Sequence, residues 1–243
     1  MHHVDLVDEL QIDRQLAALS AWLPAPPRRL LDAGCGEGQL AVALAAQGYD
    51  VRAIDVDADM VAATRANGVR ADRVNLIDYD DAPFDVVVCS LSLHHVDGLD
   101  RAVERIHRLL VPGGVLVVDE LAWERVDHHG AAWFFDMAAV LESAGLLRPR
   151  ELHRPAVDPL ARWITRHREE ERMNTGESIV TEIERRFDVR EIRRVPYLHR
   201  YLGGWLTGSN ATAVFERLAE VEQLRVMDRM VPPVGVQLLA QRT

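Results

Sequence analysis

Three glycines at alternate positions, Gly34, Gly36 and Gly38, follow a short apolar run and precede a helical pattern. Glycine lacks a Cβ, so such a loop can turn tightly and bring its backbone close to a ligand, while the helix N-terminus offers free N–H groups. This pattern predicts the edge of a cofactor site, with an ordinary tight turn as the alternative. A dinucleotide fingerprint would need glycine at position 39, where Gln39 stands, so NAD or FAD is the weaker interpretation.

An acidic residue supports the cofactor interpretation of this loop. Asp55 ends the next apolar run, about 20 residues beyond the first glycine, where a carboxylate can accept both hydroxyls of an adenosine ribose. The alternative role is that of a helix N-cap. Because Asp57 can cap the following helix by itself, we favour ribose binding for Asp55.

Four places in the first half of the chain resemble the class I S-adenosylmethionine-dependent methyltransferases. Leu31–Gly38 (LDAGCGEG) resembles the first motif of that family, and Asp55 its ribose-binding acid. Phe84–His95 (FDVVVCSLSLHH) resembles the motif of the fourth strand, and Leu109–Leu116 (LLVPGGVL) the segment that leads into the fifth. The resemblance covers roughly residues 28–120 and implies S-adenosyl-L-methionine as the cofactor.

The resemblance also implies a role for each part of the site. Gly34 and Gly36 should approach the methionyl part of the cofactor, and the backbone around Cys89 and Ser90 should meet its amino group. The cofactor-binding residues expected on this basis are Asp32, Gly34, Cys35, Gly36, Asp55, Val56, Asn75, Leu76, Cys89 and Ser90.

The adenine contact is the point at which the chain departs from many relatives. These carry an acid after the third strand, and the aligned position here is Asn75, with Leu76 beside it. Asn75 can still accept a bond from an amino group through its side-chain carbonyl. Asp78 is the competing candidate.

Two histidines, His94 and His95, follow the fourth strand and are the candidate catalytic residues. The pKa of an imidazole lies near neutrality, so either could take a proton from a hydroxyl or amine acceptor. The alternative is that the pair belongs to the strand-end motif and takes no part in the chemistry. On an extended segment adjacent side chains point to opposite sides, so at most one should face the cleft. No spacing of ligand residues predicts a metal site.

Apolar runs alternate with helical patterns as far as residue 120, which predicts βαβ units and a parallel sheet. Strands are expected at 29–33, 51–55, 69–74, 84–90 and 114–119, helices at 39–47, 58–66 and 100–110, and two closing strands at 189–195 and 235–240. The predicted fold is therefore α/β, with a doubly wound, mostly parallel seven-stranded sheet. The resemblance implies that this sheet is of the Rossmann-like methyltransferase type.

We expect one methyltransferase domain with a helical insertion. Its predicted parts are an N-terminal helix (1–23), a cofactor-binding core (28–120), a helical lid (121–188), and C-terminal strands and a helix that complete the sheet (189–243), the domain spanning 1–243. The lid carries Trp133, Phe134, Phe135 and Trp163, which could line an acceptor pocket or pack a core. Tyr197, His199 and Tyr201 alternate, which predicts one face of a strand.

Composition excludes several classes of protein. Lysine is absent and all 28 basic residues are arginine, which excludes Schiff-base lysines and Walker A lysines. The net charge of −10 disfavours nucleic acid and membrane surfaces as partners. Cys35 and Cys89 form no disulfide or zinc pattern, and neither a targeting segment nor a membrane span is evident, so a cytoplasmic protein is expected.

These observations predict an enzyme that transfers a methyl group to O, N or C of a small-molecule acceptor, with a homodimer left open. One alternative is a protein that binds S-adenosylmethionine without turnover and acts in a regulatory or structural way. An NAD-dependent oxidoreductase is a weaker alternative, because of the glycine spacing and the lack of a recognisable hydride-transfer pair.

Overall fold

The computed structural model describes residues 3–148 and 158–243. The chain divides into two compact units, each built from separate stretches of sequence. The helical unit comprises residues 1–13, 122–172 and 194–235, and the sheet unit comprises residues 14–121, 173–193 and 236–243.

The secondary structure follows the predicted alternation through the first 120 residues. In chain order the elements are α1 His3–Leu19, η1 Ser20–Trp22, β1 Arg29–Ala33, α2 Gln39–Ala46, β2 Asp50–Asp55, α3 Ala58–Ala66, β3 Arg70–Arg73, β4 Phe84–Ser90, η2 Leu93–His95, α4 Leu99–Leu109, β5 Leu110–Leu121, η3 Trp123–Arg125, α5 His128–Ser143, α6 Pro159–Ile164, η4 Thr165–Glu170, α7 Gly176–Glu184, β6 Asp188–Val195, α8 Leu198–Gly203, α9 Ala211–Met227 and β7 Gly235–Gln241.

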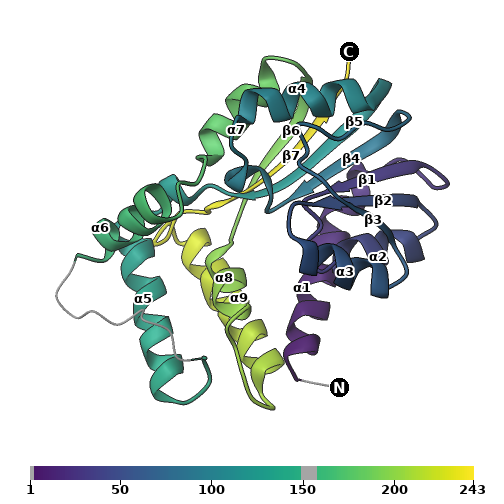
Figure 1. The fold of residues 1–243 in the computed structure, drawn as a ribbon. Helices are drawn as coiled ribbons and strands as arrows, with labels where there is room; N and C mark the ends of the chain where they lie inside the picture. Colours follow the sequence, from purple (N-terminus) through teal and green to yellow (C-terminus); the bar gives the residue numbers. More distant parts are fainter. Residues whose placement is uncertain (1–2, 149–157) are drawn as a thin grey trace. The chain divides into compact units, whose positions relative to one another are not determined.

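Seven strands form one sheet in the order β3-β2-β1-β4-β5-β7-β6 (Figure 1). The strands from β3 to β5 are parallel, with Asp32 opposite Ala53 and Ser90 opposite Asp119. The order reverses between β1 and β4, which is the switch point where open α/β sheets bind ligands. The predicted doubly wound, mostly parallel sheet is confirmed.

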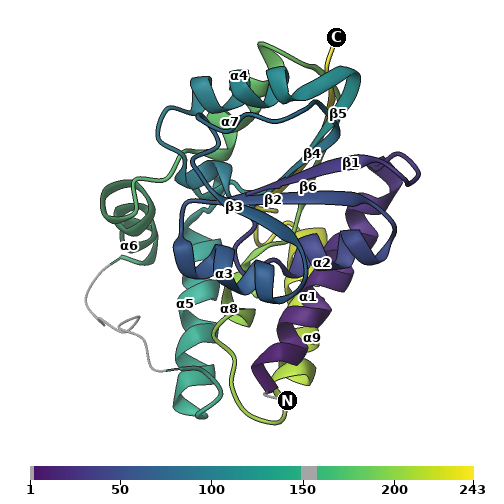
Figure 2. The ribbon, with the colours of Figure 1, turned by 45° about the vertical axis from the view of Figure 1, so that its right-hand side comes forward.

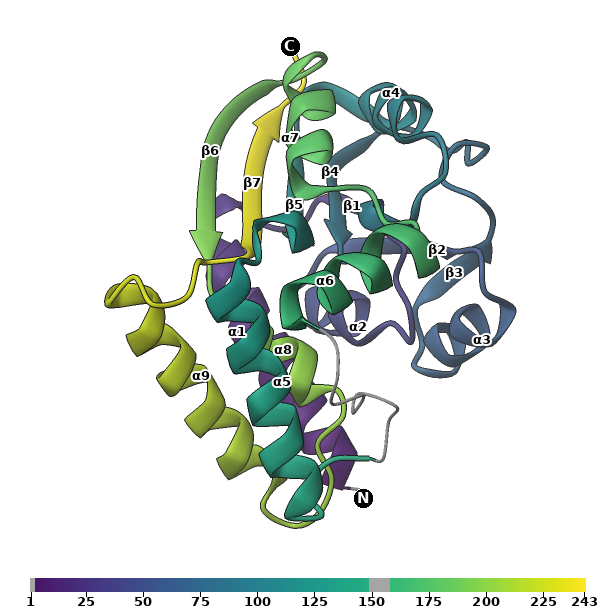
Figure 3. The ribbon, with the colours of Figure 1, turned by 90° about the vertical axis from the view of Figure 1, so that its left-hand side faces the viewer.

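The strand β7 runs against its neighbours. Near one end of β5 the Gly113 N–H donates to the Arg242 carbonyl and the Arg242 N–H donates to the Gly114 carbonyl, both at 2.9 Å, and Ala122 donates to the Val234 carbonyl at 2.7 Å beyond the other end. Figure 3 shows the β6 and β7 arrows pointing in opposite directions. The sheet is therefore mixed at this edge, which agrees with the prediction of a mostly parallel sheet.

Helices cover both faces of the sheet, which buries the parallel strands. Helices α4 and α7 lie together on one side, and α2 and α3 lie on the other (Figures 1 and 2). Helix α4 turns Ala102, Val103 and Ile106 inward, all completely buried, at the three- and four-residue steps of an amphipathic helix. Strands buried on both faces read as apolar runs, as in β4, where Val86 and Val87 are also completely buried.

The start of α3 shows how local sequence fixes an element near the site. Asp57 is the N-cap, and its Oδ1 accepts bonds from the backbone N–H groups of Asp59 and Met60 at 2.7 and 3.4 Å. Short polar side chains are preferred at this position because they satisfy the unpaired N–H groups of the first turn. Asp55 is therefore not needed as the cap of this helix.

Strand β5 is longer than predicted because the Pro-Gly-Gly segment does not interrupt it. Phe84 pairs with Leu110, but Val86 pairs with Val115, so the intervening residues of β5 bulge out of the ladder. Gly113 lies in the left-handed region with φ of +78°, which glycine adopts at no steric cost.

The helical unit has an aromatic core. Phe134 on α5 makes edge contacts with the rings of Trp163, Tyr201 and Trp205, at centroid distances of 5.1, 5.6 and 6.0 Å. Phe134 and Trp163 are each 1% exposed, and Trp133 is 6% exposed. Of the two roles considered for these aromatic residues, the structure supports core packing within this unit.

The prediction that Tyr197, His199 and Tyr201 lie on a strand is wrong, because these residues lie at α8. A distant side chain caps this helix: Glu222 on α9, completely buried, accepts bonds from the N–H groups of residues 197, 198 and 199 at 2.8 to 2.9 Å. Its Oε2 also meets His199 Nδ1 at 2.6 Å. A tertiary contact thus overrides the local alternation.

The predicted lid, residues 121–188, is divided between the two units. Residues 122–172 belong to the helical unit, whereas α7 belongs to the sheet unit and packs against α4. Residues 149–157 of the predicted lid lie outside the described part of the chain. The role of residues 121–188 in covering the acceptor stays a prediction.

Candidate functional site

A cavity of about 520 Å³ lies at the carboxyl ends of β1, β2 and β4 in the sheet unit. Its lining residues are Ala33, Gly34, Gly36, Ile54, Asp55, Val56, Val74, Asn75, Leu76, Leu91, Ser92, His95, Val96 and Asp97. Its volume falls in the range of roughly 300–1,000 Å³ found for small-molecule sites. Apolar walls with a few polar groups are typical of such sites.

The glycine loop forms one wall of this cavity. Gly34, Gly36 and Gly38 have φ of +84°, +54° and +83°, a region that other residues adopt only with strain. A Cβ on Gly34 would lie 2.3 Å from the Ser92 Cβ, and one on Gly38 would lie 2.6 Å from Thr64 Oγ1. A Cβ on Gly36 would meet no atom within 4 Å, so this glycine exposes its backbone to the open cavity.

Asp55 ends β2, and its carboxylate is fixed on the cavity wall by two backbone N–H groups. Gly36 donates to Oδ2 and Asp57 to Oδ1, both at 2.9 Å. An ionised carboxylate has about four acceptor positions, so capacity for ligand hydroxyls is left over. Asp55 thus joins the glycine loop to the second strand and presents its free lone pairs at the cavity.

Asn75 and Leu76 line the cavity beyond β3, together with Val56. The Asn75 Oδ1 accepts a bond from the Ile77 N–H at 3.0 Å, which holds this turn in shape. Asp78, the competing candidate for the adenine contact, is exposed and does not line the cavity.

Asp32 is buried behind the glycine loop, with 1% of its surface exposed. Its Oδ2 is buried and has no hydrogen-bond partner. Burial, together with the negative charge of Asp55, raises the pKa of Asp32 from 3.8 to about 7. A carboxyl group whose proton is lost near neutral pH therefore lies beside the loop.

Both cysteines are buried thiols rather than nucleophiles. Burial raises the pKa of Cys35 to about 11, and burial with the charge of Glu120 raises that of Cys89 well above its usual value. Neither side chain lines the cavity. Since the thiolate is the reactive form, both residues are chemically inert at neutral pH.

The two histidines after β4 lie on a short 3-10 turn, η2, rather than on the extended segment that was expected. His95 lines the cavity. His94 is buried, and its Nδ1 lies 2.5 Å from Glu120 Oε2. Leu91, between β4 and the turn, has φ of +52°, an uncommon conformation for a residue with a side chain.

The structure brings most of the predicted cofactor residues to one cavity, and it leaves some behind the wall. Gly34, Gly36, Asp55, Val56, Asn75, Leu76 and His95 line it, whereas Asp32, Cys35, Cys89, Ser90 and His94 do not. The lining residues that were not singled out as site residues are Ala33, Ile54, Val74, Leu91, Ser92, Val96 and Asp97. Ala33, Leu91 and Ser92 lie within the sequence motifs that end β1 and β4, which was the available signal, because strand ends line such clefts.

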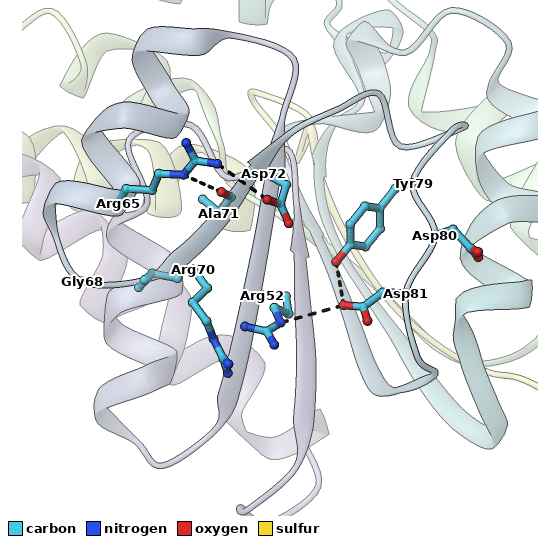
Figure 4. Close-up of a pocket in the computed structure, with 10 residues that line it drawn as sticks. Arg52, Arg65, Gly68, Arg70, Ala71, Asp72, Tyr79, Asp80 and Asp81 are labelled. Atoms are coloured by element: carbon cyan, nitrogen blue, oxygen red, sulfur yellow. Dashed lines mark hydrogen bonds and ion pairs between the residues drawn. The ribbon is translucent and has the colours of Figure 1, made fainter.

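A second concavity, of about 640 Å³, lies on the outer side of edge strand β3 (Figure 4). Several of its charged groups are paired: Arg65 lies 3.6 Å from Asp72, and Arg52 lies 3.8 Å from Asp81, which also accepts a bond from the Tyr79 hydroxyl at 3.0 Å. The Arg52–Asp81 pair ties the loop after β3 to β2. We therefore take the cavity at the glycine loop as the candidate cofactor site.

The residues of that cavity fit S-adenosylmethionine. The loop presents backbone at Gly36 without a side chain, Asp55 supplies acceptor positions for ribose hydroxyls, and Val56 and Leu76 supply apolar surface for a base. Gly38, in contrast, packs against Thr64 and not against the cavity. A loop with this spacing differs from the dinucleotide fingerprint in the place of its third glycine.

Comparison with known proteins agrees with this fit. A family model described as a methyltransferase domain matches residues 31–118. This match takes in the motifs on which the resemblance to the class I S-adenosylmethionine-dependent methyltransferases rests. The chain is 37% identical over 137 residues to malonyl-acyl-carrier-protein O-methyltransferase of Enterobacter lignolyticus, a match that covers 54% of each chain.

The chain is also similar to a second curated relative. A ubiquinone biosynthesis O-methyltransferase of Pectobacterium atrosepticum is 31% identical over 166 residues, 61% of this chain and 65% of that one. The chain thus spans between about half and two thirds of the length of these curated relatives. The crystal structure of an S-adenosylmethionine-dependent methyltransferase from Mesorhizobium loti has the same fold, with a TM-score of 0.60 and 21% identity over 95% of this chain and 100% of that chain.

No group of three or more side chains that could hold a metal ion occurs among the described residues. Within the same residues, no helix has the length and apolar character needed to cross a membrane.

Proposed function

We propose that this protein transfers a methyl group from S-adenosylmethionine to a small-molecule acceptor. The observation that carries the proposal is the cavity that unites the glycine loop, Asp55 and the Asn75–Leu76 turn at the switch point of the sheet. The bound cofactor would supply an activated methyl group. The work left for the protein is to orient the two reactants and to exclude water.

Oxygen is the acceptor atom that the relatives favour. The curated relatives from Enterobacter and Pectobacterium are both named O-methyltransferases. A hydroxyl or acid group next to His95 could give up its proton as the methyl group arrives, because an imidazole titrates near neutral pH. The helical insertion, residues 121–188, is proposed as the part of the chain that selects the acceptor.

Calorimetry with S-adenosylhomocysteine and NAD, using the parent protein and two matched variants, tests the cofactor proposal. Asp55→Ala is expected to bind S-adenosylhomocysteine roughly 10- to 150-fold more weakly, because it loses charge-assisted hydrogen bonds of about 1.5–3 kcal/mol. Asp57→Ala removes only the cap of α3 and should keep the affinity while it loses about 1 kcal/mol of stability. Tighter binding of NAD than of S-adenosylhomocysteine by the parent protein would refute the proposal.

The role of the histidines is tested by His95→Gln and His94→Gln. We expect His95→Gln to lower turnover of an acidic hydroxyl acceptor by about 10²- to 10⁴-fold, since this imidazole faces the cavity. His94→Gln should have a much smaller effect, because the glutamine amide can still donate to Glu120. Methyl transfer from labelled S-adenosylmethionine measures both rates. Equal, near-parental rates would mean that the reaction needs no base from this turn.

A further inference from the structure

The turn from Ser92 to Val96 forms part of the cavity wall. Its regular structure is limited to the 3-10 turn η2, Leu93–His95. Three of its members, Ser92, His95 and Val96, line the cavity. Buried backbone N–H and C=O groups must find partners, so other parts of the chain have to hold a turn of this kind. Two side chains from distant positions do so, one for each type of backbone group.

Glu120, near the end of β5, accepts hydrogen bonds from the N–H groups of the turn. Its side chain is completely buried, and its Oε1 accepts bonds from Ser92 N at 2.9 Å and from Leu93 N at 2.6 Å. Its Oε2 lies 2.5 Å from His94 Nδ1. One carboxylate therefore fixes both the start of the turn and the ring of its third residue, His94.

Asn174, just before α7, donates hydrogen bonds to the carbonyl groups of the same turn. Its Nδ2 donates to the carbonyl oxygens of Leu93 and Val96 at 2.9 and 2.8 Å. Its backbone N–H donates to the carbonyl of His94 at 2.8 Å. Asn174 thus bridges the beginning and the end of the turn.

We infer that Glu120 and Asn174 are positioning residues that set the cavity wall and direct the His95 imidazole into the cavity. Neither side chain lines the cavity, so each acts through the turn. The two histidine rings lie against each other with centroids 4.2 Å apart, and so Glu120, by holding His94, also limits where the His95 ring can lie. Only the expected change in cofactor affinity rests on the proposed function.

Asn174→Asp is the decisive variant, because it keeps the shape of the side chain and the backbone N–H but removes both Nδ2 donors. The control is Ser178→Ala on the same segment, an exposed side chain whose hydroxyl donates to the Thr175 carbonyl. In the ligand-free protein, nuclear magnetic resonance should show altered ring signals for His95 in Asn174→Asp and parental ring signals in Ser178→Ala. Affinity for S-adenosylhomocysteine should fall on the order of tenfold in Asn174→Asp alone, as expected for the loss of two hydrogen bonds.

Glu120→Gln separates positioning of the turn from the charge beside His94. The glutamine Oε1 can still accept from Ser92 and Leu93, so affinity for S-adenosylhomocysteine should stay near the parental value. The ring signals of His94, in contrast, should change because its carboxylate partner is replaced by a neutral amide. Parental His95 signals in Asn174→Asp would overturn the inference, whether or not the ligand binds. Failure of the parent protein to bind S-adenosylhomocysteine would instead overturn the proposed function.

Discussion

Replacement of Gly34 by alanine is expected to lower the free energy of unfolding by about 2–5 kcal/mol and to abolish tight cofactor binding. The new Cβ would lie 2.3 Å from the Ser92 Cβ, in a residue whose φ is +84°. Overpacking of this kind costs about 1–3 kcal/mol, and a left-handed residue with a side chain adds about 1–2 kcal/mol. Urea denaturation followed by circular dichroism, together with calorimetry using S-adenosylhomocysteine, measures both losses.

Gly36→Ala is the matched control for this prediction. Its φ is +54°, but a Cβ here would meet no atom within 4 Å, so only the conformational strain of about 1–2 kcal/mol should be felt. The methyl group would still occupy space on the cavity wall and weaken cofactor binding. The prediction fails if Gly34→Ala is as stable as Gly36→Ala, since the contact with Ser92 would then carry no cost.

Replacement of Asp32 by asparagine is expected to stabilise the ligand-free protein at pH 8, by up to roughly 4 kcal/mol. In the folded protein the pKa of Asp32 is raised from 3.8 to about 7, because the carboxyl group is buried and lies near the charge of Asp55. The folded state then holds this proton at pH values where the unfolded chain has lost it. Stability of the parent protein should therefore fall as the pH rises from about 4 to about 7.

The pH dependence provides the control for the Asp32 prediction. At pH 4 the parent and Asp32→Asn should unfold at similar urea concentrations, and the difference should grow up to about pH 7 and then level off. Asp72→Asn, on the exposed edge strand, should show no such growth with pH. A constant difference between Asp32→Asn and the parent from pH 4 to pH 8 would show that ionisation of Asp32 is not its cause.

The same ionisation links Asp32 to the cofactor. S-adenosylmethionine carries a sulfonium and an ammonium group, and positive charge near Asp32 favours the ionised carboxylate. Affinity of the parent protein should accordingly rise with pH toward neutrality. Asp32→Asn should lack this rise, which calorimetry at several pH values can measure.

The sequence by itself determined the order of the elements and the main features of the cofactor wall. The Gly34–Gly36 loop, Asp55 and the Asp57 cap act through backbone conformation and neighbouring residues, and local rules describe such interactions well. The apolar strands also read directly as a parallel sheet, because both of their faces are buried. The resemblance to a family then joined these features into one site.

The tertiary structure decided which histidine faces the cavity, and it decided that α8 is a helix. Glu120 meets His94 across 26 residues, and Glu222 meets His199 across 23, each as a buried carboxylate that also collects backbone N–H groups. No local pattern marks these glutamates, because their partners are set by how strands and helices pack. An alternation of side chains in sequence therefore predicted extended segments where long-range hydrogen bonds stabilise short helices.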